Sequence, residues 1–253
     1  PPTTLCERHT GGEGLSTVDS DRPGARHPKL PHGGFRLRQR GLRVFADRRE
    51  AGRLLADVVA EHRWTDPVVL GLARGGVPVA AEVARLIGAP LDVAVARKIG
   101  APDQPELGVG AVTAQGPPYY DTRTLATLGL TAEQLLPVAA LERAEAQRQM
   151  RSYHEHRAPV PLSGRDVVVV DDGLATGVTA TAALRAIRAT DPRAVAFAAP
   201  VCAARSAALL GNEADTVICL QAPGRFVAVG EWYRDFTQAT DAEVLELLNS
   251  MAS

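Results

Sequence analysis

The chain has 253 residues, of which 45% are hydrophobic, and its formal net charge at pH 7 is −1. This size predicts one large α/β domain, and the near-zero charge argues against nucleic acid or an anionic membrane as the main partner. No stretch approaches the roughly 18 apolar residues of a membrane span, and no signal-peptide pattern opens the chain, so we expect a cytoplasmic protein.

Residues 1–34 differ in composition from the rest of the chain. They are rich in Pro, Gly, Ser, Thr, His and charged residues, and their apolar residues are isolated. Such a segment buries too little apolar surface to offset its ordering entropy. We predict a disordered tail here and a folded domain over 35–253.

From Arg49 onward, the spacing of apolar residues alternates between helical and strand patterns. Helices are predicted over 49–63, from the Gly75-Gly76 turn to 87, over 131–157, from the loop that follows 167–170 to 190, over 203–210 and over 240–249. Strands are predicted over 68–73, 91–96, 107–113, 167–170, 194–199 and 215–220, with a Pro- and Gly-rich connection over 98–106. The valine run 167–170 suits a strand buried on both faces. This alternation predicts a doubly wound parallel sheet.

The valine strand runs directly into a loop with the sequence DDGLATGVT, Asp171 to Thr179. Two carboxylates at the carboxyl end of a parallel strand lie where open α/β sheets bind ligands. The loop opens a helix whose first amides favour an anion, Gly177 permits a close backbone approach, and Thr176 adds a hydroxyl. Carboxylates suit ribose hydroxyls or Mg²⁺ and the loop suits a phosphate monoester, so a ribose 5-phosphate fits both. The alternative is an acidic strand end and a threonine helix cap that bind nothing.

This segment resembles the motif with which type I phosphoribosyltransferases bind 5-phosphoribosyl-1-pyrophosphate (PRPP). The resemblance implies that fold with a small hood, and catalytic and Mg²⁺-binding roles for Asp171 and Asp172. It also implies a phosphate site formed by Ala175, Thr176, Gly177, Val178 and Thr179. Gly173 departs from the family pattern, in which an aliphatic residue is more usual, and we expect it to make the loop more flexible.

The turn Arg74-Gly75-Gly76 follows a predicted strand and opens a helix. By itself it is typical of a plain tight turn. Beside the first motif it resembles the pyrophosphate loop of the same family, in which glycine amides wrap the diphosphate and Arg74, as a catalytic group, neutralises its charge. The resemblance further implies a cis peptide bond between Ala73 and Arg74.

Arg97 and Lys98 follow directly on the next predicted strand, 91–96, before the loop 101–106. A solvated basic turn would explain them. The resemblance instead implies a mobile lid, with Arg97 binding substrate and Lys98 acting at the leaving diphosphate. Glu106 would contact the closed site or cap the following strand.

Residues 221–240, together with an N-terminal segment, resemble the hood of purine phosphoribosyltransferases. Phe226 would stack on a base, Val227 would bind it through its backbone, and Arg234 would reach pyrophosphate. A hydrophobic lid that packs on the core is the alternative. The stretch 228–230 is shorter than in the purine enzymes.

The implied reaction transfers a 5-phosphoribosyl group from PRPP to a nitrogen acceptor, a purine-like nucleobase, with Mg²⁺ and in a homodimer. A transferase with a non-nucleobase acceptor and a PRPP-sensing regulator without turnover stay open. Cys202 and Cys219 are predicted to be buried thiols outside any disulfide, and His154 and His156 to face solvent.

Overall fold

The computed structural model describes residues 35–37, without their side chains, and residues 42–251. The predicted tail, residues 1–34, lies outside the described residues. Six strands form one sheet in the order β1 (Phe35–Leu37), β9 (Thr216–Gln221), β8 (Ala194–Val201), β7 (Asp166–Val170), β2 (Pro67–Leu72) and β3 (Leu91–Ala94). Every neighbouring pair in it is parallel, which confirms the predicted doubly wound sheet.

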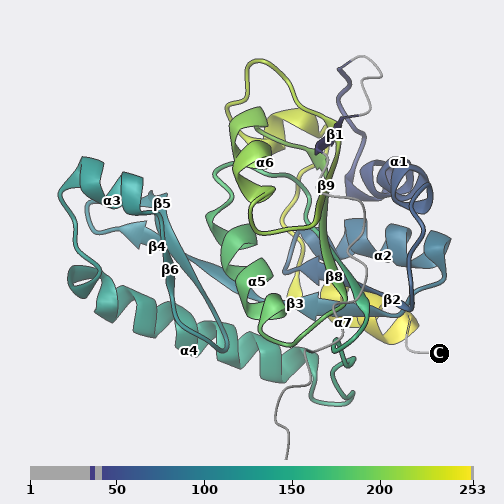
Figure 1. Cartoon of the computed structure of the whole chain (residues 1–253), viewed down its shortest axis with the longest axis horizontal. Helices are drawn as coiled ribbons and strands as arrows, with labels where there is room; N and C mark the ends of the chain where they lie inside the picture. The colour runs from purple at the N-terminus through teal and green to yellow at the C-terminus, as the bar shows by residue number, and fades with distance from the viewer. Residues whose placement is uncertain (1–34, 38–41, 252–253) are drawn as a thin grey trace, which may run out of the picture.

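Helices cover both faces of this sheet (Figure 1). The core on one face contains α1 (Arg48–Ala60), α2 (Gly76–Ile87) and α7 (Asp241–Ser250), and the core on the other contains α5 (Val178–Arg188) and α6 (Ala204–Leu210).

The valine run of β7 divides between these two cores. Val168 and Val170 pack on the α1–α2 side, whereas Val167 and Val169 pack on the α5–α6 side. All four are fully buried, and burial stabilises each by about 1.5–3 kcal/mol. The strand is therefore held firmly at the point where its carboxyl end enters the DDGLATGVT loop.

An arm, residues 96–153, is inserted between β3 and β7 and projects away from the sheet in Figure 1. It contains β4 (Ala96–Ala101), β5 (Gln104–Thr113), β6 (Tyr119–Tyr120), α3 (Thr122–Leu128), the 3₁₀ turn η1 (Glu133–Leu135) and α4 (Leu136–Tyr153). The three strands form a separate antiparallel sheet.

The sequence predicted an irregular connection over 98–106, and this prediction is wrong. Most of it belongs to a hairpin in which Ala101 pairs with Gln104 and only Pro102 and Asp103 make the turn. The prolines and glycines of this stretch favour a loop by local preference alone. Pairing between β4 and β5 supplies hydrogen bonds that outweigh this preference.

The base of the arm is anchored to the core by two consecutive residues, Tyr153 and His154. The buried Tyr153 hydroxyl donates a hydrogen bond to Asp241 of α7. His154 was predicted to face solvent, and this is wrong: its side chain is 11% exposed and its Nε2 lies 2.9 Å from Oδ1 of Asp92 on β3. A charged helix pattern hid this histidine, whereas His156 is exposed as predicted.

Residues 222–240 form a segment after β9 that we call the hood segment. It contains the 3₁₀ turn η2 (Val229–Trp232) and pairs with residues 45–46: Phe45 N donates to the Trp232 carbonyl at 2.8 Å and Arg234 N donates to the Phe45 carbonyl at 2.8 Å. The N-terminal and C-terminal parts predicted to form a hood thus lie together.

Within the described residues, no single helix is long and apolar enough to cross a membrane. Only α3 taken together with η1 and α4 reaches that length and composition, and a 95° bend separates the two parts.

Candidate active site

The acid pair lies at the carboxyl end of β7. Asp171 N donates to the Ala198 carbonyl at 3.1 Å, and Asp172 N donates to Oδ1 of Asp171 at 2.9 Å. Burial raises the pKa of Asp171 well above its usual range, and the neighbouring Asp172 carboxylate adds to this effect. Burial also raises the pKa of Asp172, against the opposing charge of Arg48. The pair is thus a desolvated site whose ionised carboxylates a cation or a hydroxyl donor would stabilise.

The Arg74-Gly75-Gly76 turn packs directly on this pair, because β2 and β7 are hydrogen-bonded neighbours. A Cβ on Gly75 would lie 2.1 Å from Oδ2 of Asp172, and one on Gly76 would lie 2.4 Å from the Val170 carbonyl oxygen. Only glycine fits so close an approach. The peptide bond between Ala73 and Arg74 is cis, as the family resemblance implied.

The Arg74 side chain extends from this turn toward α7. Its Nη1 lies 4.0 Å from Oδ1 of Asp241, the same carboxylate that accepts the Tyr153 hydroxyl. Arg74 is only partly buried, so its guanidinium is accessible to a diphosphate that binds beside the turn.

The remainder of the predicted PRPP loop leads from the acid pair into α5. Leu174 N donates to the Val201 carbonyl at 2.8 Å and its carbonyl accepts from Ala203 N at 2.7 Å, which fixes the loop to the end of β8. Gly177 has a φ of 81°, a left-handed conformation that favours glycine, and α5 begins at the next residue. The first amides of α5 have no acceptor within the helix, as an anion site requires.

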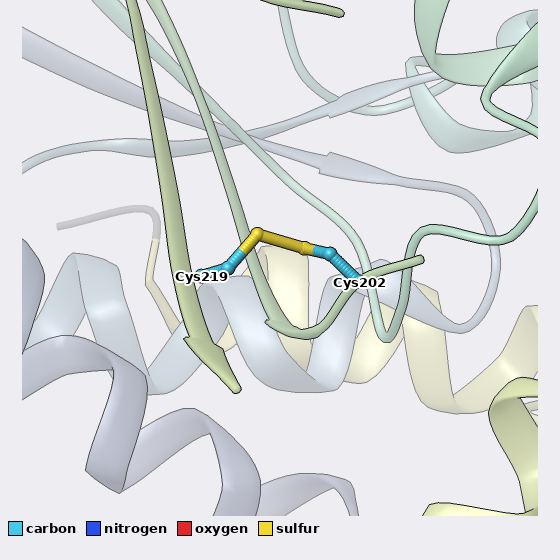
Figure 2. Close-up of a disulfide and its surroundings, with 2 residues drawn as sticks. All are labelled: Cys202 and Cys219. Atoms are coloured by element: carbon cyan, nitrogen blue, oxygen red, sulfur yellow. A yellow bond between two sulfur atoms is a disulfide. The ribbon is translucent and has the colours of Figure 1, made fainter. Parts of the chain in front are cut away.

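A disulfide between Cys202 and Cys219 lies beside this loop. This corrects the prediction that the two cysteines are free thiols. Figure 2 shows the bond linking Cys202, just after β8, to Cys219 in β9. Their Cα atoms are 6.3 Å apart and both residues are fully buried. The separation of 17 residues in sequence gave no sign of the pairing, because the pairing follows from the adjacency of β8 and β9 in the sheet. Cys202 also forms a β-bridge with Leu174 of the loop.

Arg97 and Lys98 lie on β4, which follows the carboxyl end of β3 in the chain. Arg97 Nε donates to Glu142 at 2.5 Å, and Lys98 Nζ donates to the side chain of Glu106 at 3.0 Å. A cavity of about 590 Å³ is lined by both cations, both carboxylates and Thr179. The structure therefore brings Arg97 and Lys98 together with the end of the predicted phosphate loop.

The hood segment and the first residue of α1 reach the acid pair through side chains that the sequence did not single out. Tyr233, which is buried, donates its hydroxyl to the Asp172 carbonyl at 2.6 Å. Arg48 Nε donates to Oδ2 of Asp172 at 2.8 Å. By contrast, the predicted base contact Val227 is 60% exposed, and Arg234 and Phe226 lie on exposed or half-buried stretches.

The sequence carried a signal for Tyr233, which lies in the short stretch 231–236 together with Trp232 and Phe236. Arg48 had none, because 124 residues separate it from Asp172 in sequence.

The predicted Mg²⁺ site has Asp171 and Asp172 as its protein ligands. Within the described part of the chain, no group of three or more His, Cys, Asp or Glu side chains could hold a metal ion. Proteins commonly bind Mg²⁺ through one or two carboxylates together with substrate phosphates. The donor set fits that pattern, with the remaining oxygens coming from substrate or water.

Comparison with known proteins agrees with the geometry. The family model described as phosphoribosyl transferase domain matches residues 46–233. Proteins of two Mycobacterium tuberculosis strains, each named "Putative phosphoribosyl transferase", are 43% identical over 208 residues, which is 82% of this chain and 47% of their own length. The chain thus spans about half the length of these curated relatives.

A crystal structure of the protein TT1426 from Thermus thermophilus is 41% identical and superposes with a TM-score of 0.70. The match covers 83% of this chain and 100% of TT1426. The matched region of the family model takes in the acid pair, the glycine turn, the loop into α5 and the arm, and on this ground the chain belongs to the phosphoribosyl transferase domain family.

Proposed function

We propose that this chain transfers a 5-phosphoribosyl group from PRPP to a nitrogen acceptor, a purine-like nucleobase, and releases pyrophosphate. One observation carries the proposal: the acid pair, the glycine turn and the N-terminus of α5 meet at one edge of the sheet. PRPP carries a hydroxylated ribose between a diphosphate and a phosphate monoester, so these three features match its three parts.

The reaction breaks the bond between ribose C1 and the diphosphate oxygen, and a bond between C1 and the acceptor nitrogen forms. The bonding electrons leave with pyrophosphate, and the acceptor nitrogen gives up a proton to solvent. Positive charge develops on the ribose, so the carboxylates of Asp171 and Asp172 stabilise it while they bind the ribose hydroxyls. Bound Mg²⁺ would neutralise the leaving diphosphate.

Cations of this chain act on the same leaving group. Arg74, beside the glycine turn, and Lys98, on β4, both have accessible side chains that can neutralise the diphosphate. Ala175 to Thr179 hold the 5-phosphate through the first amides of α5. The β4–β5 hairpin would exclude water, which would otherwise hydrolyse PRPP.

Pyrophosphate release tests the proposal directly. The chain is incubated with PRPP and Mg²⁺, alone and with each member of a panel of purines, pyrimidines and amino sugars. Release that depends on a purine supports the proposal, and release that depends on another amine assigns a non-nucleobase acceptor. PRPP binding without release under any condition identifies a sensor. Failure of the chain to bind PRPP would contradict all three.

A further inference from the structure

One arginine connects the acid pair to the hood segment. Arg48 is the first residue of α1, and its Nε donates to Oδ2 of Asp172 at 2.8 Å. Its Nη1 donates to the Thr237 carbonyl at 2.7 Å, and its guanidinium lies 4.0 Å from the centre of the Phe236 ring. From these contacts we propose that Arg48 is a positioning residue of the site, which fixes the Asp172 carboxylate for ribose binding and holds the hood segment beside it. This rests on the proposed function.

The location of Arg48 is a poor one for stability alone. A cation at the N-terminus of a helix opposes the positive end of the helix dipole. The side chains of Arg48 and Asp172 are only 11% and 14% exposed, so both charges are largely removed from water. Ion pairs of this kind are often no more stabilising than apolar residues of similar volume. The arrangement therefore points to a role at the site.

The contact leaves one carboxylate oxygen available. Arg48 binds Oδ2 of Asp172, and the Tyr233 hydroxyl binds the main-chain carbonyl of the same residue. Among the contacts of the described residues, no side chain donates a hydrogen bond to Oδ1 of Asp172. Two fixed points set the direction of the carboxylate, so Oδ1 is presented to a ribose hydroxyl without a search among rotamers.

The same guanidinium holds the hood segment. The guanidinium lies over the Phe236 ring, which in turn packs at a tilt against Tyr233 with the ring centres 5.1 Å apart. The Thr237 carbonyl accepts a hydrogen bond from Nη1. Lysine carries the charge but has neither the planar face nor the fork of donors. Substitution by lysine should therefore keep part of the Asp172 contact and lose the contact with the hood segment.

The test measures PRPP binding in the presence of Mg²⁺ by calorimetry, on the full chain, for Arg48→Lys, Arg48→Met and Arg48→Ala. We expect Arg48→Met to weaken binding about tenfold or more and Arg48→Lys to weaken it less. Methylguanidine should restore binding to Arg48→Ala, but not to Asp172→Asn. Arg53→Met, an exposed arginine of the same helix, is the matched control and should bind like the unmodified chain.

Thermal unfolding of each variant separates misfolding from a local effect. Normal binding by Arg48→Met would overturn the inference while leaving the proposed function intact. Weak binding that neither lysine nor methylguanidine improves would also overturn it, since the arginine would then act through general structure. An unmodified chain that does not bind PRPP would instead overturn the proposed function itself.

Discussion

Gly173 faces Val229 so closely that a Cβ added to Gly173 would lie 2.4 Å from Cγ1 of Val229. The aliphatic side chain that the family usually carries in this loop is thus replaced, in space, by one from the hood segment. Gly173 is explained by this close approach rather than by a need for a flexible loop.

Gly173→Ala should destabilise the fold by about 1–3 kcal/mol, because the new methyl group overlaps a branched side chain beside the acid pair. The double variant Gly173→Ala/Val229→Ala should recover part of that loss, since it removes Cγ1 and Cγ2 of Val229, the two atoms nearest to the new methyl group. Thermal unfolding measures both. Gly224→Ala is the control: a Cβ at Gly224 meets no atom within 4 Å, so its midpoint should not change. An equal change of the unfolding midpoint in Gly173→Ala and Gly224→Ala would contradict the overlap with Val229.

Asp171→Asn should stabilise the fold while it removes PRPP binding. The raised pKa of Asp171 means that ionisation opposes folding, so the penalty grows as pH rises from the unfolded value of 3.8 to the folded value. Asparagine is neutral and can still accept the Asp172 amide, and we expect a gain of about 1–2 kcal/mol at pH 7. The gain should vanish below pH 3.8, where both forms are neutral. Asp166→Asn, at the other end of β7, should instead destabilise, because it weakens the pair with Arg193.

Asp92→Asn should destabilise the chain at neutral pH. Burial opposes ionisation of Asp92, but hydrogen bonds from His154 and the Val160 amide outweigh it and lower the pKa below 3.8. The ionised form therefore stabilises the fold above pH 3.8, and this contribution is lost as pH falls through the folded pKa. Unfolding measured against pH should show a loss of about 1–3 kcal/mol at pH 7 that shrinks in acid.

The Asp92 prediction can be checked at its partner, His154, with the neighbouring His156 as the control. His154→Gln should also destabilise, whereas His156→Gln, at an exposed position, should not. A pH-independent loss in Asp92→Asn would mean that packing, rather than charge, accounts for the effect.

Removing the disulfide should lower the stability by about 2–4 kcal/mol, because Cys202–Cys219 constrains the unfolded chain. Both sulfurs are buried, so a dithiol reductant should act only on molecules that have opened. Unfolding followed with and without reductant tests this in the native chain. Cys202→Ala/Cys219→Ala should give the same midpoint in both conditions, and a reductant effect on that variant would point to another cause.

The sequence was most informative where the physics is local or periodic. The valine run, the acid pair and the glycine-containing loop follow one another along the chain, so the central strand and its ligand-binding end were predictable together. The parallel orientation of the strands also followed, since alternating strands and helices permit few other arrangements.

Side chains that meet across the fold could not be predicted. Arg48, at the start of α1, meets Asp172 at the carboxyl end of β7, and Cys202 meets Cys219 because β8 and β9 are neighbours in the sheet. Neither pair can be recognised from the spacing of its two residues along the chain. His154 was missed for a related reason: its partner, the Asp92 carboxylate, lies on β3, far from His154 in sequence.

The carboxylate of Asp241 is a junction at which three separate parts of the molecule meet. It receives the hydroxyl of Tyr153 at the base of the arm and lies 4.0 Å from Arg74 of the glycine turn, while its own helix packs on the core. The base of the arm and the arginine proposed to meet the diphosphate therefore share one carboxylate oxygen, Oδ1 of Asp241, as a neighbour.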